Sequence, residues 1–402
     1  MTRYEGTGTA ADWWVYRGRW APPRGAAGSS ASSGPSGPAA ELPEPPPWRS
    51  FGLGALASPE EAEGLPEDDP RRPVRAPQPS PGDSSWEDHI AVSYQGDGEA
   101  HDLVNAAIHL RRPLLVTGPP GTGKTTLAAS IARELALGPV LRWGITSRST
   151  LREGLYEYDV LARLHDLNIQ QRLPRRPDAV EGQPKRATSL RANPGPKGAP
   201  KEAAQQVPPE APEDIGRYIR LGPLGDALLP RLKPRVLLID EIDKSDVDLP
   251  NDLLHVFETG GYEIPELRRA ERSPVRVLSA DGGDRVPVHE GKVRCAQFPV
   301  VILTSNGERE FSSAFRRRCL FLKLKHPEGD RLKEIVRTHV PELTDADQVA
   351  DLVQAYEKLR AEGRQLSPDQ LINAVRLRLT THMGPQDLDV IRNAVLHSLS
   401  GS

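Results

Sequence analysis

The segment with the clearest chemistry is a glycine-rich run at residues 118–125, Gly-Pro-Pro-Gly-Thr-Gly-Lys-Thr. It satisfies the P-loop pattern G-x-x-x-x-G-K-[ST]. It follows a short apolar run at 113–118 and opens a helical pattern at 124–137. Glycines let the backbone wrap around phosphate groups so that amide N–H groups point inward. We therefore expect a phosphate-binding loop here, and a chance glycine turn is the alternative.

Each polar residue of this loop has an expected role. The side chain of Lys124 would reach the β- and γ-phosphates of a nucleotide, and the hydroxyl of Thr125 would bind Mg²⁺. The positive end of the following helix adds to the attraction for phosphate. The expected nucleotide-binding residues are Gly118, Pro119, Pro120, Gly121, Thr122, Gly123, Lys124, Thr125 and Thr126.

Two carboxylates end a second apolar run, Val-Leu-Leu-Ile-Asp-Glu at 236–241. A continuous apolar run is typical of a strand buried on both faces, and open α/β sheets bind ligands at the carboxyl ends of their strands. Asp240 would help to bind the nucleotide by holding Mg²⁺ through water, as a Walker-B aspartate does. Glu241 would orient or deprotonate the attacking water. A strand that ends in a solvated acidic turn is the alternative.

Asparagine and arginine supply two further candidate groups. Asn306 ends another buried apolar run and would position water near the γ-phosphate, although a turn-forming asparagine is the alternative. Arg317 and Arg318 end a run of three arginines before the apolar segment 319–324. Arginine stabilises developing phosphoryl charge, often from a neighbouring subunit. A basic turn or a generic anion-binding patch is the alternative.

These residues require a parallel sheet with helices between its strands. Apolar runs alternate with helical patterns along the chain, which is typical of βαβ units. From residue 327 onward the pattern is helical, which predicts a separate C-terminal helical lid. The five expected strands are 113–118, 139–146, 235–240, 299–306 and 319–324.

Proline marks the limits of the folded region. Of the 40 prolines, 15 lie in residues 1–85 and nine in residues 174–212. Both segments are poor in large apolar residues and cannot bury enough surface to offset the entropy of ordering. We therefore predict a disordered N-terminal arm over 1–85 and an α/β domain over 86–325 with a low-complexity insert at 174–212. The helical lid would cover 326–402.

Composition favours a soluble cytoplasmic protein. The formal net charge of -3 gives no sign of a nucleic-acid or membrane partner. The two cysteines cannot form a disulfide framework. No apolar run reaches the ~20 residues that a membrane span needs, and the N-terminus lacks the apolar core of a signal peptide.

The order of these motifs resembles that of AAA+ ATPases, and the runs at 148–159 and 300–324 resemble the MoxR-like branch. The resemblance covers about 86–402 apart from the insert. It implies ATP and Mg²⁺ as ligands and a homo-oligomer, a hexameric ring. Arg317 and Arg318 would then be fingers that act on the ATP of a neighbouring subunit, with Arg318 as the first choice.

The same resemblance implies a β-hairpin at 275–294, before the sensor strand, and a protein client, such as a von Willebrand A-domain protein. We expect the hairpin to contact that client. One position departs from the family pattern. Many relatives carry a second-sensor arginine after a Ser-Pro pair, whereas Asp369 follows Ser367-Pro368 here. Either Arg364 or Arg376 takes its place, or the sensor is absent.

Three functions stay open at this stage. ATP hydrolysis coupled to remodelling of a partner protein is favoured by Glu241. A regulatory nucleotide switch with little turnover, for instance in a bacterial defence system, is favoured by the departure at Asp369. A DNA-associated motor is the third, and the near-neutral charge does not favour it.

Overall fold

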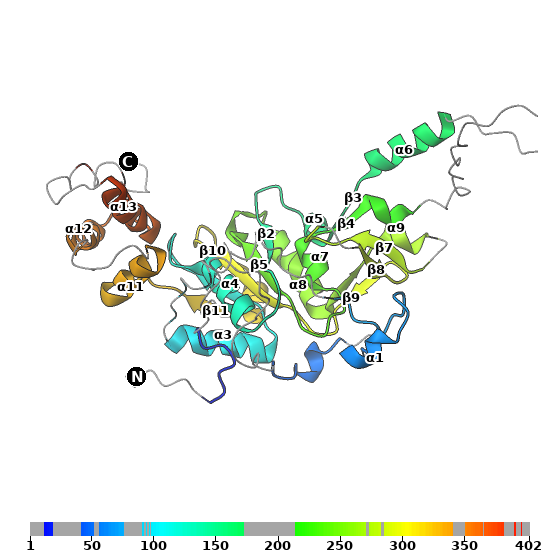
Figure 1. Cartoon of the computed structure of the whole chain (residues 1–402), viewed down its shortest axis with the longest axis horizontal. Helices are drawn as coiled ribbons and strands as arrows, with labels where there is room; N and C mark the ends of the chain where they lie inside the picture. The colour runs from blue at the N-terminus through cyan, green and yellow to red at the C-terminus, as the bar shows by residue number, and fades with distance from the viewer. Residues whose placement is uncertain are drawn as a thin grey trace, which may run out of the picture.

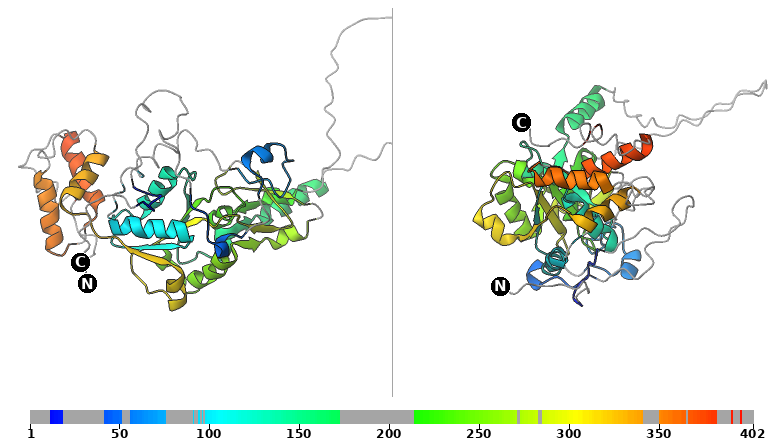
Figure 2. Two further views of the ribbon diagram at one scale, coloured as in Figure 1. Left: turned by 90° about the horizontal axis from the view of Figure 1, so that it is seen from below. Right: turned by 90° about the vertical axis from the view of Figure 1, so that its left-hand side faces the viewer.

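The α/β core lies between two projecting parts, the lid helices at one end and helix α6 at the other (Figures 1 and 2). This computed structural model describes residues 12–18, 42–51, 56–75, 91, 94, 96, 98–172, 214–270, 273–282, 285–340, 350–364, 366–381, 390 and 395. The predicted insert at 174–212 lies outside these residues.

The core is a five-stranded parallel sheet in the order β11-β1-β10-β5-β2. Its strands are β1 (Leu114–Thr117), β2 (Leu141–Gly144), β5 (Val236–Asp240), β10 (Val300–Ser305) and β11 (Leu320–Lys323). The predicted fold class and all five predicted strands are confirmed. Because β1, β10 and β5 are neighbours and run the same way, their carboxyl ends bring the P-loop, Asn306 and Asp240 to one edge.

Helices cover both faces of this sheet. Alternate strand residues belong to two different apolar cores, with Leu115 and Leu237 in one and Val116 and Leu238 in the other. This burial on both faces explains why the strands are continuous apolar runs. Helices α3 (Gly98–Leu110) and α4 (Lys124–Glu134) cover one face. Helices α7 (Pro223–Ala227), α8 (Leu249–Thr259) and α10 (Ser313–Arg318) cover the other.

A second sheet flanks the core, and only part of it was predicted. Its strands are β3 (Tyr156–Tyr158), β4 (Ile219–Leu221), β7 (Val275–Leu278) and β8 (Arg285–Val288). The antiparallel pair β7–β8 confirms a hairpin. The last residues of the predicted 275–294 hairpin do not belong to it, because β9 (Lys292–Arg294) pairs with β6 (Gly261–Glu263).

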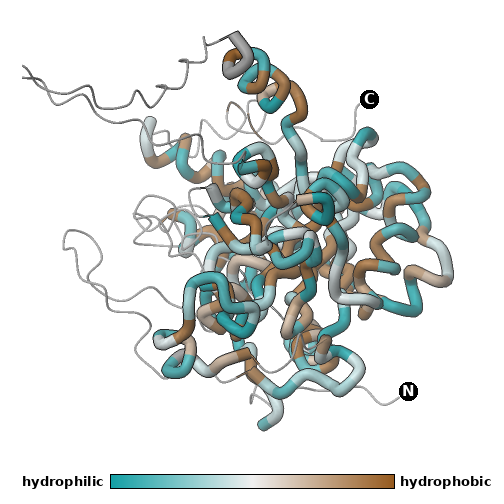
Figure 3. The backbone as a smooth tube through the Cα atoms, turned by 90° about the vertical axis from the view of Figure 1, so that its right-hand side faces the viewer, coloured by the Kyte–Doolittle hydropathy of each residue, from teal (hydrophilic) through white to brown (hydrophobic). Residues whose placement is uncertain are grey.

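The segment that follows β2 contains three short elements. Helix α5 (Leu151–Leu155) leads into β3, and α6 (Val160–Arg172) follows. Helix α6 stands away from the core and carries apolar residues (Figure 3), among them Leu161, which is 79% exposed.

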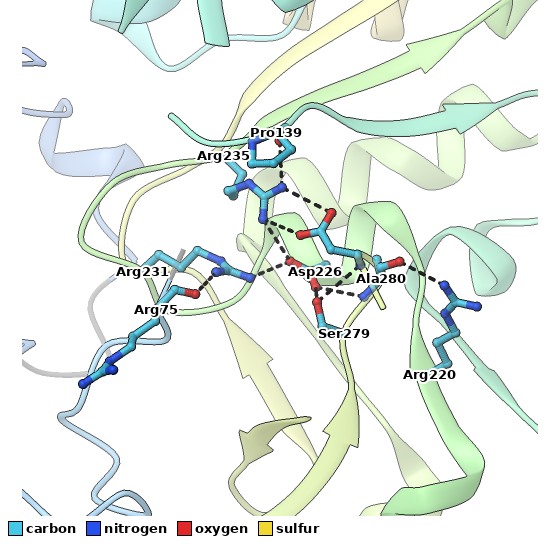
Figure 4. A network of polar contacts seen from close by, with 9 residues as sticks. Arg75, Pro139, Arg220, Asp226, Arg231, Arg235, Ser279 and Ala280 are labelled. Carbon is cyan, nitrogen blue, oxygen red and sulfur yellow. Dashed lines mark hydrogen bonds and ion pairs between the residues drawn. The ribbon is translucent and has the colours of Figure 1, made fainter. Parts of the chain in front are cut away.

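A buried ion network ties the β7–β8 hairpin to the start of β5 (Figure 4). Asp226 accepts from Arg231 at 2.6 Å and from the hydroxyl of Ser279 at 2.5 Å. Arg235 pairs with Asp281 at 2.8 Å, in the turn after β7. The hairpin turn is therefore attached to the amino end of the sheet, the end opposite the P-loop. Asp281 is a structural partner of a buried arginine, but Asp281 and Gly282 are exposed, so the expected contact of the hairpin with a client stays a prediction.

Three segments within residues 1–85 require a correction to the predicted disordered arm. Residues 12–18 pack on α3 and α4, and residues 42–51 and 56–75 also pack on the core, the last with a short helix, α1 (Pro59–Glu63). Tyr16 is 0% exposed and its hydroxyl contacts that of Ser130 at 2.8 Å. Proline excludes long regular elements, but single aromatic side chains supply enough buried surface to hold these segments in place. The remaining residues of 1–85 lie outside the described part of the chain.

The lid contains three described helices with a core of their own. They are α11 (Gly329–His339), α12 (Ala350–Ala361) and α13 (Pro368–Thr381). Leu332, Tyr356 and Leu371 are fully buried among them. Of the residues that follow α13, only 390 and 395 are described. No helix in the described part of the chain is long and apolar enough to cross a membrane.

Candidate functional site

The P-loop has the backbone conformation that its glycines predict. Gly121 and Gly123 have φ of 75° and 86°, a region that residues with a Cβ rarely adopt. Gly123 directly precedes α4, whose first residue is Lys124. A Cβ at Gly121 would lie 2.7 Å from Cδ of Pro368. The lid therefore packs directly on the loop, and glycine is needed there for space as well as for conformation.

Lys124 is buried and makes three hydrogen bonds. Its Nζ donates to Oδ1 of Asn306 at 2.7 Å and to the carbonyl oxygens of Gly118 at 2.6 Å and Pro119 at 3.0 Å. Burial lowers the pKa of this ammonium group, and the nearby carboxylates, Asp240 first, oppose the shift. The structure thus joins the predicted phosphate-binding lysine to the predicted sensor asparagine, 182 positions later in the chain.

Glu241 completes a line of contacts from Lys124. Nδ2 of Asn306 donates to Oε1 of Glu241 at 3.5 Å, and Nζ of Lys244 donates to Oε2 at 2.7 Å. The backbone of Glu241 is left-handed, with φ 60° and ψ 47°. A non-glycine residue in this region is strained, and such strain clusters at functional sites.

Thr304 and Asp243, which were not predicted as site residues, hold these contacts in place. The hydroxyl of Thr304 donates to Oδ1 of Asp240 and accepts from the backbone N–H of Glu241 at 2.9 Å. Oδ2 of Asp243 accepts from the backbone N–H of Asn306 at 2.9 Å. A signal was available for Thr304, since it is one of two polar residues, with Ser305, at the end of a fully buried strand. Asp243 had none, because an acidic residue after a strand is ordinary.

The predicted magnesium ligands fit the chemistry of that ion. Asp240 ends β5 and is half-buried, and Thr125 lines the cavity beside the P-loop. No group of three acidic, histidine or cysteine residues that could hold a metal occurs among the described residues. Magnesium in phosphate sites needs only one or two protein ligands, because water and the phosphates supply the others. A pair such as Thr125 and Asp240 is therefore sufficient.

Beside the contact between Gly121 and Pro368, a cavity of about 250 Å³ is lined by both the P-loop and the lid. The P-loop lines one side with residues 121–126, and the lid lines the other with residues of α11 and α13. Tyr94 also lines it and lies close to Gly123. The lining residues outside the P-loop are Tyr94, Lys325, Pro327, Arg331, Ile335, His339, Pro368, Asp369 and Ile372.

The structure does not bring Arg317 and Arg318 to the P-loop of their own chain. Helix α10 leads into the amino end of β11, whereas the P-loop follows the carboxyl end of the parallel strand β1. Arg318 is 40% exposed and its Nε donates to Glu258 at 2.6 Å. The backbone carbonyls of both arginines accept from Arg112, which precedes β1. An action on the chain's own nucleotide is therefore excluded by the strand directions.

The two arginines considered for the second sensor, Arg364 and Arg376, do not line the cavity either. Arg376 donates to the backbone oxygen of His339 at 2.9 Å, and Arg364 is exposed. Neither lines the cavity, whereas Arg331 and Asp369 do. Position 369 thus presents a carboxylate where the family pattern has a guanidinium.

Comparison with known families adds one match to this geometry. A family model described as "ATPase family associated with various cellular activities (AAA)" matches residues 114–160, which include β1, the P-loop and α4. The match covers the first part of the α/β core.

The solved structures similar to this chain include two proteins of Thermotoga maritima. Domain III of the replication initiation protein DnaA has 15% identity and a TM-score of 0.36, over 77% of this chain and 97% of that one. The RuvB Holliday junction branch migration motor has 16% identity and a TM-score of 0.34, over 74% of this chain and 67% of that one. A search of curated proteins finds no match.

Proposed function

We propose that this chain binds ATP with Mg²⁺ and hydrolyses it to ADP and phosphate, as a MoxR-like AAA+ ATPase. The observation that carries the proposal is the line of contacts from Lys124 through Asn306 to Glu241. It connects the group that binds phosphate to a carboxylate that can act on water, through an amide that contacts both. A merely structural turn after β5 would not need this arrangement.

Each residue has a defined part in this reaction. On nucleotide binding, Lys124 would exchange the carbonyl oxygens of Gly118 and Pro119 for phosphate oxygens, which keeps its ammonium group satisfied. Glu241 would orient the attacking water and accept its proton, and Asn306 would hold that water near the γ-phosphate. Magnesium, when held by Thr125 and Asp240, supplies positive charge that stabilises the transferring phosphoryl group.

We further propose that the protein acts as a homo-oligomeric ring, hexameric as in the MoxR-like branch. Arg318, and after it Arg317, would then reach the nucleotide of a neighbouring subunit. Their place at the amino end of the sheet and the exposure of Arg318 support a role in trans. The energy of hydrolysis would remodel a client protein, with a von Willebrand A-domain protein as the first candidate.

A regulatory switch with little turnover is the second candidate. It is favoured by the ion pair between Lys244 and Glu241, at 2.7 Å. A carboxylate held in this way has one oxygen occupied and is less available to an attacking water. In this alternative the protein binds ATP and assembles but releases phosphate slowly.

Steady-state phosphate release tests the proposal. The wild-type protein is assayed with ATP, with and without Mg²⁺, beside Lys124→Ala. We expect turnover that requires Mg²⁺ and is lost in the variant, because Lys124 is the main cation of the P-loop. Tight ATP binding with negligible turnover would instead support the switch, and the absence of ATP binding would refute both.

A further inference from the structure

One face of helix α11 lines the cavity opposite the P-loop. Arg331, Ile335 and His339 are four residues apart, so they form a single line along the helix. The opposite side of the same cavity is formed by Gly121 to Thr126. A nucleotide held by the P-loop would therefore lie against this face of the lid.

Arg331 is the one arginine among the residues that line this cavity, and it is half-buried. Among the described residues its guanidinium has no hydrogen-bond or ion-pair partner. Asp369 lines the same cavity and makes no ion pair with it. Lys325, the other cation on the lid side, is exposed and so more fully hydrated. A half-buried guanidinium without a protein partner is poorly satisfied, and an anion in the cavity would satisfy it.

We propose that Arg331 binds a phosphate group of the bound nucleotide and thereby ties the lid to the P-loop. This inference rests on the proposed function, because it requires a nucleotide in the cavity. It places the lid cation on the first turn of α11, whereas neither Arg364 nor Arg376 lines the cavity. Asp369 then leaves α13 without a phosphate-binding group.

The consequence is a lid that responds to the nucleotide. The direct contact between lid and loop at Gly121 is apolar and involves Ser367 and Pro368. Such a contact does not depend on whether phosphate is present. A charge-assisted bond from Arg331 to a phosphate exists only with nucleotide bound, so it couples the position of α11 to occupancy of the P-loop.

The test compares Arg331→Ala, Arg331→Gln and Arg331→Lys for binding of ADP and ATP in the presence of Mg²⁺, by titration calorimetry. The matched control is Arg337→Ala, because Arg337 is exposed on the same helix and does not line the cavity. We expect Arg331→Ala and Arg331→Gln to weaken the binding of both nucleotides by about tenfold or more. Arg331→Lys keeps the charge and should recover most of the loss, and Arg337→Ala should match the wild type.

Hydrogen exchange of α11 with and without ADP provides the second readout. Wild-type α11 should be protected by ADP, and Arg331→Ala should lose that protection while its thermal unfolding without nucleotide stays unchanged. Affinities of Arg331→Ala within twofold of Arg337→Ala would overturn the inference, as would equal losses in the Gln and Lys variants. If Lys124→Ala also bound nucleotides like the wild type, the proposed function itself would fail.

Discussion

At the scale of single residues, the site is a set of side chains whose neighbours fix their positions. Asn306 accepts from Lys124 and donates to Glu241, and Thr304 joins Asp240 to the backbone of Glu241. These contacts hold the carboxylate of Glu241 in place. The backbone of Glu241 is left-handed, a conformation that costs free energy. These contacts explain why a strained residue persists at this point of the chain.

The first prediction concerns Thr304. Thr304→Val keeps the shape of the side chain and removes the hydroxyl that serves both Asp240 and Glu241. We expect a loss of about 1–3 kcal/mol in the free energy of unfolding, because a buried N–H is left without a partner. ATP turnover should fall by more than ATP affinity. Denaturant unfolding and phosphate release measure these effects, and Thr380→Val is the control, because Thr380 is an exposed residue near the end of α13. Wild-type turnover in Thr304→Val would contradict the role given to this hydroxyl.

The second prediction concerns pH. Burial, with help from Arg360 and Lys124, lowers the pKa of His326 to about 4. An unfolded histidine titrates near pH 6.5, so between about pH 6.5 and 4 the unfolded chain binds the proton more tightly. The contribution to stability is full above pH 6.5 and is lost as the pH falls towards 4. Between pH 7 and pH 5 we expect the free energy of unfolding of the wild type to fall by about 1 kcal/mol more than that of His326→Asn. This figure is reduced because solvent partly screens the side chain. Parallel unfolding curves for the two proteins would refute this.

At the scale of elements, the parallel sheet determines which groups can meet. The carboxyl ends of β1, β5 and β10 gather the P-loop, Asp240 and Asn306, while the amino end carries Arg235 and the hairpin turn. The buried network around Asp226 belongs to this second end. Its task is therefore attachment of the flanking sheet, which is distinct from the chemistry at the other end.

The third prediction tests that attachment. Asp226 is 0% exposed and pairs with Arg231, which is 4% exposed. Asp226→Ala would leave the buried guanidinium of Arg231 without its carboxylate and would remove one of two carboxylates from Arg235, which keeps Asp281. We expect a loss of about 3–5 kcal/mol in the free energy of unfolding. The control is Glu263→Ala, which breaks the exposed pair with Arg268 and should cost at most about 1 kcal/mol. Similar losses in both variants, measured by denaturant unfolding, would show that the network is not a structural anchor.

Much of the arrangement of strands and helices could be predicted from the sequence. The five strands of the sheet are apolar runs because both of their faces are buried, so each run was visible. Strands β3 and β4 are only three residues long and carry no clear pattern, so the flanking sheet was missed apart from its hairpin. The segment around Tyr16 was missed because its support comes from α3 and α4, about 90 to 115 positions later in the chain.

The candidate site could likewise be predicted in part from the sequence. Lys124, Asp240, Glu241 and Asn306 follow strand ends, and parallel strands bring such ends together. The roles of Thr304 and Asp243 depend on hydrogen bonds across strands, which no local pattern reveals. Arg331 lies in a lid helix whose orientation towards the P-loop is a property of tertiary packing, so composition and spacing could not select it.

At the scale of the whole molecule, the question is how many chains make one complete site. Arg317 and Arg318 cannot serve the nucleotide of their own chain, because they lie at the opposite end of the sheet. A complete site would therefore need a second copy, in a ring of the kind proposed above.

The fourth prediction tests this assembly. Arg318→Ala and Glu241→Gln should each be inactive alone, since every interface in either ring lacks one group. A mixture of the two should recover part of the ATPase activity, because some interfaces then hold both an intact Arg318 and an intact Glu241. Co-purification of differently tagged chains confirms mixing. Co-assembled variants that remain inactive would argue against an arginine acting in trans.

The central claim is that Glu241, held beside Asn306 and Lys124, acts on the water that attacks ATP. Glu241→Gln separates this step from binding, because the amide keeps the shape of the side chain and cannot accept a proton. The decisive measurement is ATP affinity and phosphate release on the same preparation of this variant. We predict an ATP Kd within about threefold of the wild type and a rate of hydrolysis lower by about 10²-fold or more. Hydrolysis at the wild-type rate would contradict the account.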